Sequence, residues 1–240
     1  MDKFRIEVIK ATPNPQQVMW LAMHQDYSEE FVWDQRDRAP DETQAGDNVI
    51  KYLLAGERGH YGPLEHPQIT LNVGFFPHSM MQQVRTHRVG ISFDVQSFRY
   101  TGKRILDVAE GKRDVEDVFY IRPVGDYTNR QGKRYSYTQG QRSEDLEWCI
   151  QASQRYQQRI AEGLAEEHAR GIIPFDTRQH FVMSCNARSL MHLLDLRWKK
   201  DAQLEAQKFS ELLFERFQAW TPQLAQWYLE TRAKKAKLSP

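Results

Sequence analysis

The side chains best suited to chemistry are arginines and histidines gathered in one short stretch of the chain. Arg85, His87, Arg88 and Arg99 fall within fifteen residues, and the hydroxyl of Ser97 lies between them. A guanidinium group that loses its water needs bidentate acceptors, and the oxygens of a phosphate match that geometry. The stretch therefore predicts an anion site. Surface arginines paired with acids are the alternative, and residue types alone leave both interpretations open.

A second constellation falls in residues 186–197, which have the spacing of a helix. One face of that helix would carry Asn186, Leu190, Leu193, Leu194 and Arg197. The opposite face would carry Arg188 and His192, beside Asp195. An arginine on an apolar face is unusual for a surface helix. We expect this helix to be buried, with its polar groups directed at ligands or other subunits. An internal pair between Arg197 and an acid is the alternative.

Two further segments give weaker signals. In the turn HYGPLEH, His60 and His66 with Glu65 could ligate a metal, but no further ligand sits at the spacing of a zinc site, so we expect no metal. Arg170 precedes Pro174 and is expected to end a long amphipathic helix, where a cation is favourable.

Composition limits the class of protein. The chain has 240 residues, with 33 Lys and Arg against 32 Asp and Glu, so its net charge of +1 argues against a bulk binder of nucleic acid or membrane surfaces. Two cysteines exclude a disulfide framework and a cysteine-based zinc site. No apolar run approaches the ~18 residues of a membrane span. We expect one domain over residues 1–240 in a soluble, cytoplasmic protein.

The elements that must position these groups are mixed α/β first and helical afterwards. Alternating apolar residues predict strands near residues 4–8 and 69–75 and an extended segment at 89–95. Proline and capping residues predict helices from 15 to about 25, from 41 or 43 to about 54, and from 77. Residues 101–142 are interpreted as a surface insertion with a strand at 118–121 and a hairpin containing Tyr135 and Tyr137. Apolar stripes then predict helices over residues 146–164 and 206–220.

These pieces, in this order, resemble the flavin-dependent thymidylate synthases. The signature of that family is Arg-His-Arg, seven residues and Ser, often followed by Arg-Tyr, and it is similar to RTHRVGISFDVQSFRY here. HYGPLEH resembles the family's His-x-x-Pro-x-Glu-His turn. ARGIIP, NARSLMHLLDLR and the opening KATPNPQQV resemble three further family segments. The likeness runs from about residue 6 to about residue 220 and weakens in the 101–142 insertion.

The resemblance implies an enzyme and a fold. Members transfer the methylene of 5,10-methylenetetrahydrofolate to C5 of dUMP, with FAD as cofactor and NADPH as the usual reductant, and they release dTMP. The implied fold is α/β, with a central, mostly antiparallel sheet flanked by helices and a helical C-terminal half. The implied assembly is a homotetramer whose active sites are shared between subunits.

The resemblance also assigns roles to individual residues. Flavin binding is implied for His60, Arg85, His87, Arg88, Asn186, Arg188 and His192. Binding of the nucleotide is implied for Gln82, Arg85, Ser97, Phe98, Arg99, Arg170 and Arg197.

Arg197 carries the catalytic role in this interpretation. Uracil C5 is a poor nucleophile unless negative charge is pushed into the ring, and a cation beside N3 and O4 stabilises that charge. At low local dielectric Arg197 could supply it, so no protein nucleophile is required. Cys185 is the alternative nucleophile, but a buried cysteine behaves mostly as a small apolar residue.

The chain departs from the family pattern at several positions. Thr86 separates Arg85 from the His-Arg pair, and eight residues rather than seven precede Ser97. Gly62, Asp94, Val95 and Asp201 stand where Thr, Asn, Glu and His are common in the family. Two other classes remain as competing hypotheses. They are a nucleotide or RNA binder that uses the arginine cluster and a structural oligomer whose arginines only pair with acids.

Overall fold

The chain divides into two compact units in the computed structural model, which describes residues 3–129 and 131–235. Unit 1 comprises residues 3–4, 74–83 and 95–181, and unit 2 comprises residues 5–73, 84–94 and 182–235. The division cuts through strands, so each unit is assembled from three separate segments of the chain. The single domain expected over the whole chain stays a prediction.

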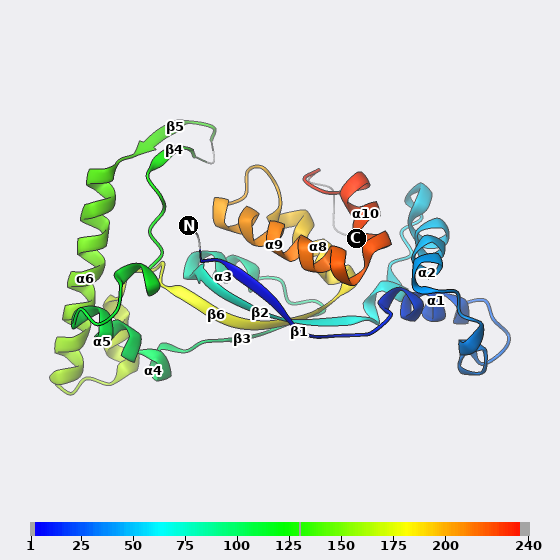
Figure 1. Cartoon of the computed structure of the whole chain (residues 1–240), viewed down its shortest axis with the longest axis horizontal. Helices are drawn as coiled ribbons and strands as arrows, with labels where there is room; N and C mark the ends of the chain where they lie inside the picture. Colours follow the sequence, from blue (N-terminus) through cyan, green and yellow to red (C-terminus); the bar gives the residue numbers. More distant parts are fainter. Residues whose placement is uncertain (1–2, 130, 236–240) are drawn as a thin grey trace. The chain divides into compact units, whose positions relative to one another are not determined.

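A four-stranded sheet links the segments of the chain. Its order is β1 (Arg5–Ala11), β2 (Gln68–Pro77), β6 (Arg178–Asn186) and β3 (Ile91–Val95). The expected fold class, α/β with an antiparallel sheet and a helical C-terminal half, is confirmed (Figure 1). The strands predicted near residues 4–8 and 69–75 are present as β1 and β2. Strands β2 and β6 each contribute residues to both units.

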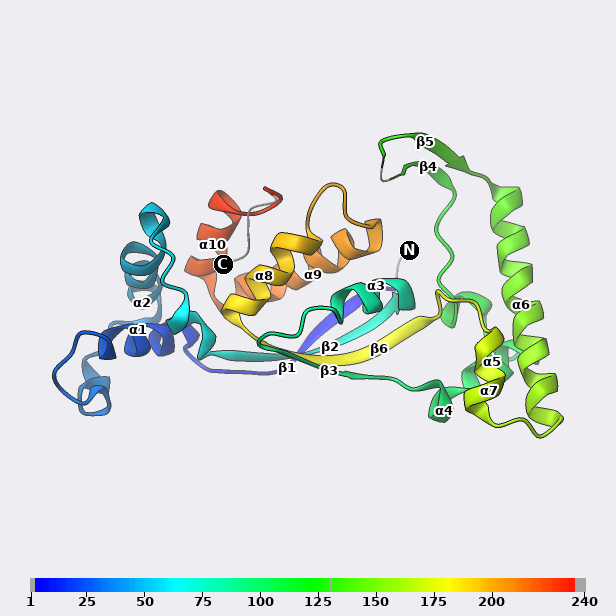
Figure 2. The ribbon, with the colours of Figure 1, turned by 180° about the vertical axis from the view of Figure 1, so that it is seen from behind.

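The helices of unit 2 form two groups, one within residues 15–49 and one within residues 187–231. α1 (Pro15–Gln25) lies beside α2 (Glu42–Val49), which continues as a π-helical turn over Ile50–Leu54. α8 (Ala187–Arg197) contacts α9 (Leu204–Trp220), and α9 contacts β1 (Figures 1 and 2). α10 (Pro222–Thr231) follows at once. The short 3-10 helices are η1 (Val32–Arg38), η3 (Ala55–Glu57) and η4 (Gly62–Glu65).

Unit 1 holds the segment that we interpreted as an insertion. Its elements in chain order are α3 (His78–Val84, which ends at the boundary), α4 (Phe98–Thr101), α5 (Lys103–Ala109), η5 (Val115–Asp117), β4 (Gly125–Thr128), β5 (Arg134–Tyr137), α6 (Gln139–Ala161), α7 (Glu166–Ala169) and η6 (Arg170–Ile172). The predicted hairpin is confirmed, because β4 pairs with β5 and places Tyr127 opposite Tyr135.

The insertion is more ordered than the sequence predicts. Ile105 and Val108 of α5 are buried against Cys149 and Tyr156 of α6, so this segment supplies half of a hydrophobic core. Gly102 allows the close approach, since a Cβ there would lie 2.3 Å from the Tyr156 hydroxyl. The alternating charges of residues 101–114 concealed this helix.

The predicted strand at 118–121 is wrong. Val118, Phe119 and Tyr120 are all buried, and only one isolated bridge, between Phe119 and Thr177, forms there. The Tyr120 amide donates to the Asp176 carbonyl at 2.8 Å and the Arg178 amide donates to the Val118 carbonyl at 2.7 Å, and this pair of hydrogen bonds does not continue into a strand. The apolar residues at 118–121 therefore indicated burial correctly, but they did not indicate the secondary structure.

Two other boundaries differ from expectation. β3 begins at Ile91, and Val89 is 88% exposed because Gly90 turns the chain with a φ of 67°. The long helix ends at Ala161, and Arg170 follows the separate short helix α7. The position of Pro174 had suggested that Arg170 ends the amphipathic helix, and that prediction is wrong.

Helix α8 is held in place by a buried ion pair. Asp195 is 3% exposed, and its carboxylate contacts the guanidinium of Arg232, which is 8% exposed and directly follows α10. Burial of two charges is favourable only when they pair closely. The pair therefore ties the helix that carries His192 and Arg197 to the end of α10.

We predict that Arg232→Met destabilises the protein strongly. It leaves the Asp195 carboxylate buried without its cation, which costs about 3–5 kcal/mol of unfolding free energy. Urea denaturation measures the change. Lys235→Met removes a charge from an exposed residue three positions away, and we expect it to change stability by less than about 0.5 kcal/mol. Equal effects of the two substitutions would contradict the role of the pair.

Candidate active site

Arg197 lies at the centre of the polar cluster in unit 2. Its Nε donates to Nε2 of His87 at 3.0 Å, and its Nη2 donates to Oγ1 of Thr86 at 3.0 Å. Both acceptors are uncharged groups, so they orient the guanidinium and add no negative charge to its surroundings. Partial burial lowers the pKa of Arg197, yet a guanidinium remains protonated in proteins.

His87 is held in its neutral form. Burial, and then the charge of Arg197, lower the pKa of His87 to about 4. A neutral imidazole can accept at Nε2 only if its proton lies on Nδ1. The two residues therefore depend on each other, because the histidine orients the arginine and the arginine keeps the histidine uncharged.

His192 joins the same cluster. Its ring lies 5.3 Å from the ring of His87, in an edge-to-face arrangement. Burial is the main cause that lowers the pKa of His192, and the Asp195 carboxylate opposes it. The sequence placed His192 and Arg197 on opposite faces of the helix. In the structure His87 contacts both of them, so one side chain bridges the two faces.

The N-terminus of α8 is built against the turn that follows Arg88. The Asn186 side chain caps the helix by accepting from the Ser189 amide at 2.7 Å. A Cβ on Gly90 would lie 2.2 Å from Ser189 Oγ and 2.6 Å from Asn186 Nδ2. Only glycine fits, and the backbone of the arginine-rich segment therefore lies directly on the helix.

The HYGPLEH turn also lies at α8. The guanidinium of Arg188 pairs with Glu65 and lies 5.7 Å from the ring of Tyr61. His60 is exposed on the same turn, where its amide donates to the Leu53 carbonyl at 3.2 Å. The structure thus brings together three of the four predicted segments in unit 2.

Arg85 and Arg88 are exposed in that unit, and neither forms an ion pair with any residue in 3–129 or 131–235. Their charges are therefore available to an anionic ligand.

The remaining predicted site residues belong to unit 1. Ser97 caps α4 by accepting from the Arg99 amide at 3.4 Å, and Arg99 forms a loose pair with Glu167 at 3.6 Å. Both members of that pair are more than half exposed, so the pair is weak. The ring of Phe98 lies under the guanidinium of Arg104, and Arg170 is half-buried after α7.

Gln82 is also in unit 1 and exposed. Its amide nitrogen lies 2.8 Å from Nε2 of His78.

Thr86 is the functional residue that sequence reasoning missed. It was noted only as an extra residue in the signature, yet its hydroxyl accepts a hydrogen bond from Arg197. No local pattern signals this contact, because it joins residues 111 positions apart. The Asp195–Arg232 pair was also missed, because its members are 37 residues apart.

Cys185 is placed poorly for nucleophilic chemistry. It is fully buried, and burial raises the pKa of its thiol to about 12. The thiolate is the reactive form of cysteine, and it is essentially absent at neutral pH with that pKa.

Comparison with known proteins settles the family. A family model described as "Thymidylate synthase complementing protein" matches residues 7–223. A flavin-dependent thymidylate synthase of Haloarcula marismortui is 33% identical over 250 residues, which cover 98% of this chain and 99% of the relative. The chain belongs to the flavin-dependent thymidylate synthases. A family member from Halobacterium salinarum is 32% identical, with 98% of this chain and all of the relative covered.

Solved structures support the fold of this flavin-dependent thymidylate synthase family. A UMP/dUMP methylase, PolB, from Streptomyces cacaoi matches with a TM-score of 0.74 at 23% identity, over 100% of this chain and 99% of the other. Thymidylate Synthase X from Helicobacter pylori, solved with FAD and dUMP, matches with a TM-score of 0.70 at 17% identity, over 97% and 99%. The chain is therefore an enzyme of the transferase class, and its family implies FAD and methylation of dUMP to dTMP.

The residues of unit 2 fit a flavin cofactor. A pyrophosphate needs cations and backbone amides, and the exposed Arg85 and Arg88 lie in the segment whose glycine contacts the capped start of α8. Within the described ranges no three His, Cys, Asp or Glu side chains gather as a metal site. None of the helices there has the length and hydropathy to cross a bilayer.

We predict that His87 makes stability depend on pH. Its folded-state pKa of about 4 is below the ordinary 6.5, so the unfolded chain binds the proton more readily. Stability therefore decreases as the pH falls from about 6.5 to about 4 and levels off below, by about 2–3 kcal/mol for this group. Melting temperatures across that range measure it.

The variant His87→Gln should flatten this dependence. A smaller slope will remain, because burial also lowers the pKa values of His192 and His180. If His87→Gln kept the full wild-type decrease, the neutral state of His87 would be excluded as its cause.

Proposed function

We propose that the protein reductively methylates dUMP to dTMP, with 5,10-methylenetetrahydrofolate as carbon donor, NADPH as reductant and FAD as cofactor. The family membership supports the nucleotide and the flavin. The proposal for the pyrimidine chemistry depends on one observation, the guanidinium of Arg197 held by two neutral acceptors.

Arg197 activates the pyrimidine in this proposal. C5 of uracil becomes nucleophilic towards the methylene carbon when negative charge develops at N3 and O4 of the ring, and a cation beside these atoms stabilises that charge. An uncharged imidazole and a hydroxyl accept hydrogen bonds from this cation without placing a negative charge beside it. Because His87 and Thr86 fix two nitrogens of the group, little reorganisation is needed when that charge develops.

Activation of this kind removes the need for a protein nucleophile. The thiol alternative is disfavoured by the burial and raised pKa of Cys185. Cys149, the other cysteine, is buried in unit 1, and burial raises its pKa to about 12 as well. Neither cysteine is poised to add to the C6 position of the nucleotide.

The proposed flavin site uses residues of unit 2. Arg85 and Arg88 pair with the pyrophosphate, while Asn186 and Arg188 contribute from the start of α8. His60, His87 and His192 complete the set. FAD, when bound and reduced, supplies the electrons that convert the transferred methylene to a methyl group.

The proposed nucleotide site uses Ser97, Arg99 and Arg170 for the phosphate of dUMP. The weak, exposed pair between Arg99 and Glu167 supports this role, because a phosphate dianion competes easily with one carboxylate. Gln82, Arg85, Phe98 and Arg197 contact the rest of the nucleotide in the proposal.

A homotetramer with shared active sites, in the cytoplasm, completes the proposal. Arg85 and Arg88, exposed and without acid partners, support binding sites that a second subunit helps to form.

We predict that Arg197→Gln abolishes most of the activity. The loss of the cation should slow tritium release from C5-labelled dUMP by about 10²-fold or more, at unchanged melting temperature. The assay is run with and without FAD and NADPH. Arg197→Lys keeps the charge but loses the forked contacts, so its rate should fall between those of wild type and Arg197→Gln.

The matched control is Arg155→Gln, which removes one exposed arginine from α6 and should release tritium at the wild-type rate. Two results would reject the proposal. One is wild-type release by Arg197→Gln, and the other is release that needs neither FAD nor reductant.

We also predict that Ser97→Ala and Arg170→Ala weaken dUMP binding selectively. Loss of a charge-assisted hydrogen bond to the phosphate should raise the dissociation constant of dUMP by about tenfold. FAD affinity, read from flavin fluorescence, should change by less than about threefold. Equal weakening of both ligands would contradict the phosphate assignment.

A further inference from the structure

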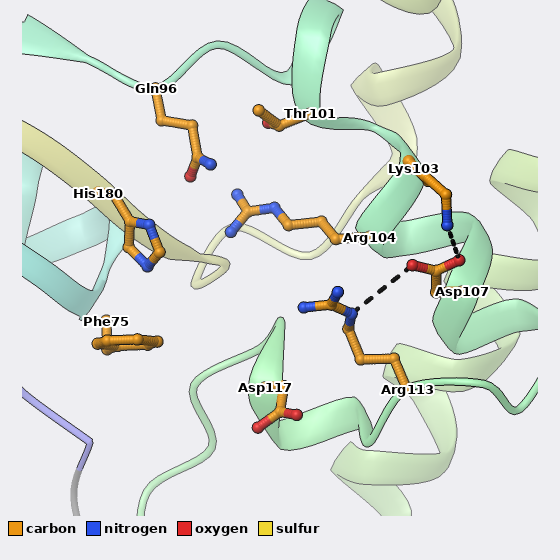
Figure 3. Close-up of a pocket in the computed structure, with 9 residues that line it drawn as sticks. All are labelled: Phe75, Gln96, Thr101, Lys103, Arg104, Asp107, Arg113, Asp117 and His180. Atoms are coloured by element: carbon orange, nitrogen blue, oxygen red, sulfur yellow. Dashed lines mark hydrogen bonds and ion pairs between the residues drawn. The ribbon is translucent and has the colours of Figure 1, made fainter.

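Unit 1 contains a polar cavity of about 620 Å³ that none of the residues assigned above lines. Figure 3 shows Arg104 and Arg113 pointing into it from different elements, with Gln96 and His180 on the opposite side. Arg104 belongs to α5, within the segment in which the chain resembles its family least. Six of the nine residues that line the cavity belong to the 101–142 segment, and Phe75, Gln96 and His180 complete it from outside that segment.

Arg104 is fixed there on one side only. Its Nη1 donates to the Arg178 carbonyl at 2.7 Å, and its guanidinium carbon lies 4.7 Å from the ring centroid of Phe98. Its Nε and Nη2 are shielded from water and have no hydrogen-bond partner among the described residues. These two nitrogens form one edge of the planar group, which is the edge that grips an oxyanion with two parallel bonds.

No carboxylate balances this charge. The cavity has two acids, but Asp107 is shared by Lys103 at 2.7 Å and Arg113 at 3.7 Å, and Asp117 pairs with Lys3. Arg104 forms no ion pair in the part of the chain that the structure describes. A second cation, Arg113, instead lines the same cavity, and its charge contributes to the lowered pKa of Arg104.

Burial of Arg104, and the charge that it carries, contribute to the lowered pKa values of two groups, Arg104 and His180. Burial, and then Arg113, lower the pKa of Arg104 to about 10. Burial and the charge of Arg104 also lower the pKa of His180. An unpaired buried cation is unfavourable, and an anion in the cavity would remove that penalty.

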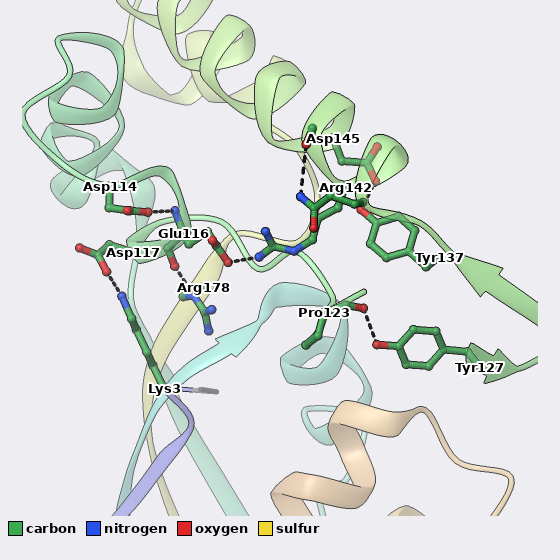
Figure 4. Close-up of polar contacts among 12 residues, drawn as sticks. Lys3, Asp114, Glu116, Asp117, Pro123, Tyr127, Tyr137, Arg142, Asp145 and Arg178 are labelled. Atoms are coloured by element: carbon green, nitrogen blue, oxygen red, sulfur yellow. Dashed lines mark hydrogen bonds and ion pairs between the residues drawn. The ribbon is translucent and has the colours of Figure 1, made fainter. Parts of the chain in front are cut away.

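The walls of the cavity are already positioned. Arg178, whose carbonyl holds Arg104, donates from Nε to the Glu116 carbonyl at 2.7 Å and from Nη1 to the Phe75 carbonyl at 2.8 Å. Glu116 pairs in turn with Arg142 of α6, and Asp117 with Lys3 (Figure 4). Preorganised walls lower the entropy that binding must overcome.

A further unpaired group defines the ligand more closely. Gln96 Oε1 is buried and accepts no hydrogen bond, so a donor on the ligand would satisfy it. Two guanidinium groups can engage three oxygens of one tetrahedral anion, whereas a carboxylate offers only two. The chemistry therefore favours a phosphate group over a carboxylate.

We propose that this cavity is a second anion site, which binds a phosphate monoester or free phosphate through the Nε–Nη2 edge of Arg104 and the guanidinium of Arg113, with Gln96 accepting from a hydroxyl of the ligand. It shares no residue with Ser97, Arg99 and Arg170, the proposed phosphate contacts of dUMP. The proposal goes beyond thymidylate synthesis and does not require it.

Calorimetric titration with inorganic phosphate tests the site, on the full-length protein with its flavin and saturating dUMP. Wild type should bind phosphate, and Arg104→Gln should bind it about tenfold or more weakly. Phosphate should also raise the melting temperature of wild type but not of Arg104→Gln. Arg155→Gln, with one exposed charge removed, should match wild type in both measurements.

Arg113→Gln keeps the test valid if Arg104→Gln does not fold, because Arg113 is 44% exposed and makes only a long contact to Asp107. We expect it to weaken phosphate binding by about threefold to tenfold. Undiminished phosphate affinity in the folded variants would overturn the proposal. So would loss of all phosphate binding once dUMP is saturating, since the cavity would then belong to the dUMP site.

Competition identifies the natural source of the phosphate. NADPH carries a 2′-phosphate monoester and NADH does not. Displacement of phosphate by NADPH alone would support the site with the reductant as its ligand. If neither NADPH nor NADH displaces phosphate, the result would support the cavity as a site for free phosphate. Equal displacement by both would contradict recognition of a monoester.

Discussion

The charge of Arg197, kept partly out of water, is the constraint on which the rest of unit 2 depends. Arg197 is oriented by His87 and Thr86, which are neutral acceptors. A carboxylate in the place of either would hold the guanidinium more firmly and would cancel the field that a pyrimidine needs. The low pKa of His87 follows from the same requirement, because a protonated histidine could not accept from Arg197.

Helix α8 satisfies that constraint by being held at both ends. Asn186 caps its start and Gly90 brings the arginine-rich segment onto it, while Asp195 pairs with Arg232 near its end. His192 and Arg197 can then meet His87 from one short helix. Fixing a side chain through several independent contacts is the general means of preorganising a site. The buried pair thus contributes to the position of Arg197 without touching it.

The sequence predicted the parts of the structure that depend on local periodicity and on short motifs. The strands β1 and β2, the helix α1 and the hairpin containing Tyr135 were found in this way. It failed at Val118–Tyr120, where burial comes from tertiary packing, and at α5, whose charged residues conceal two core positions. The role of Thr86 could not be predicted either, because the contact to Arg197 spans 111 positions. Contacts between distant residues carry no local pattern.

Three arginines show how one residue type serves different ends according to its neighbours. Arg232 forms an ion pair with a buried carboxylate, so its charge is neutralised and its role is structural. Arg197 donates to two neutral acceptors, which fix its direction and add no negative charge. Arg104 meets one carbonyl and an aromatic face, and two of its nitrogens have no partner. A charge already paired inside the protein has little to offer a ligand, whereas an unpaired one gains most from an anion. The environment of each guanidinium, more than its position in a motif, therefore separates structural from ligand-binding arginines in this chain.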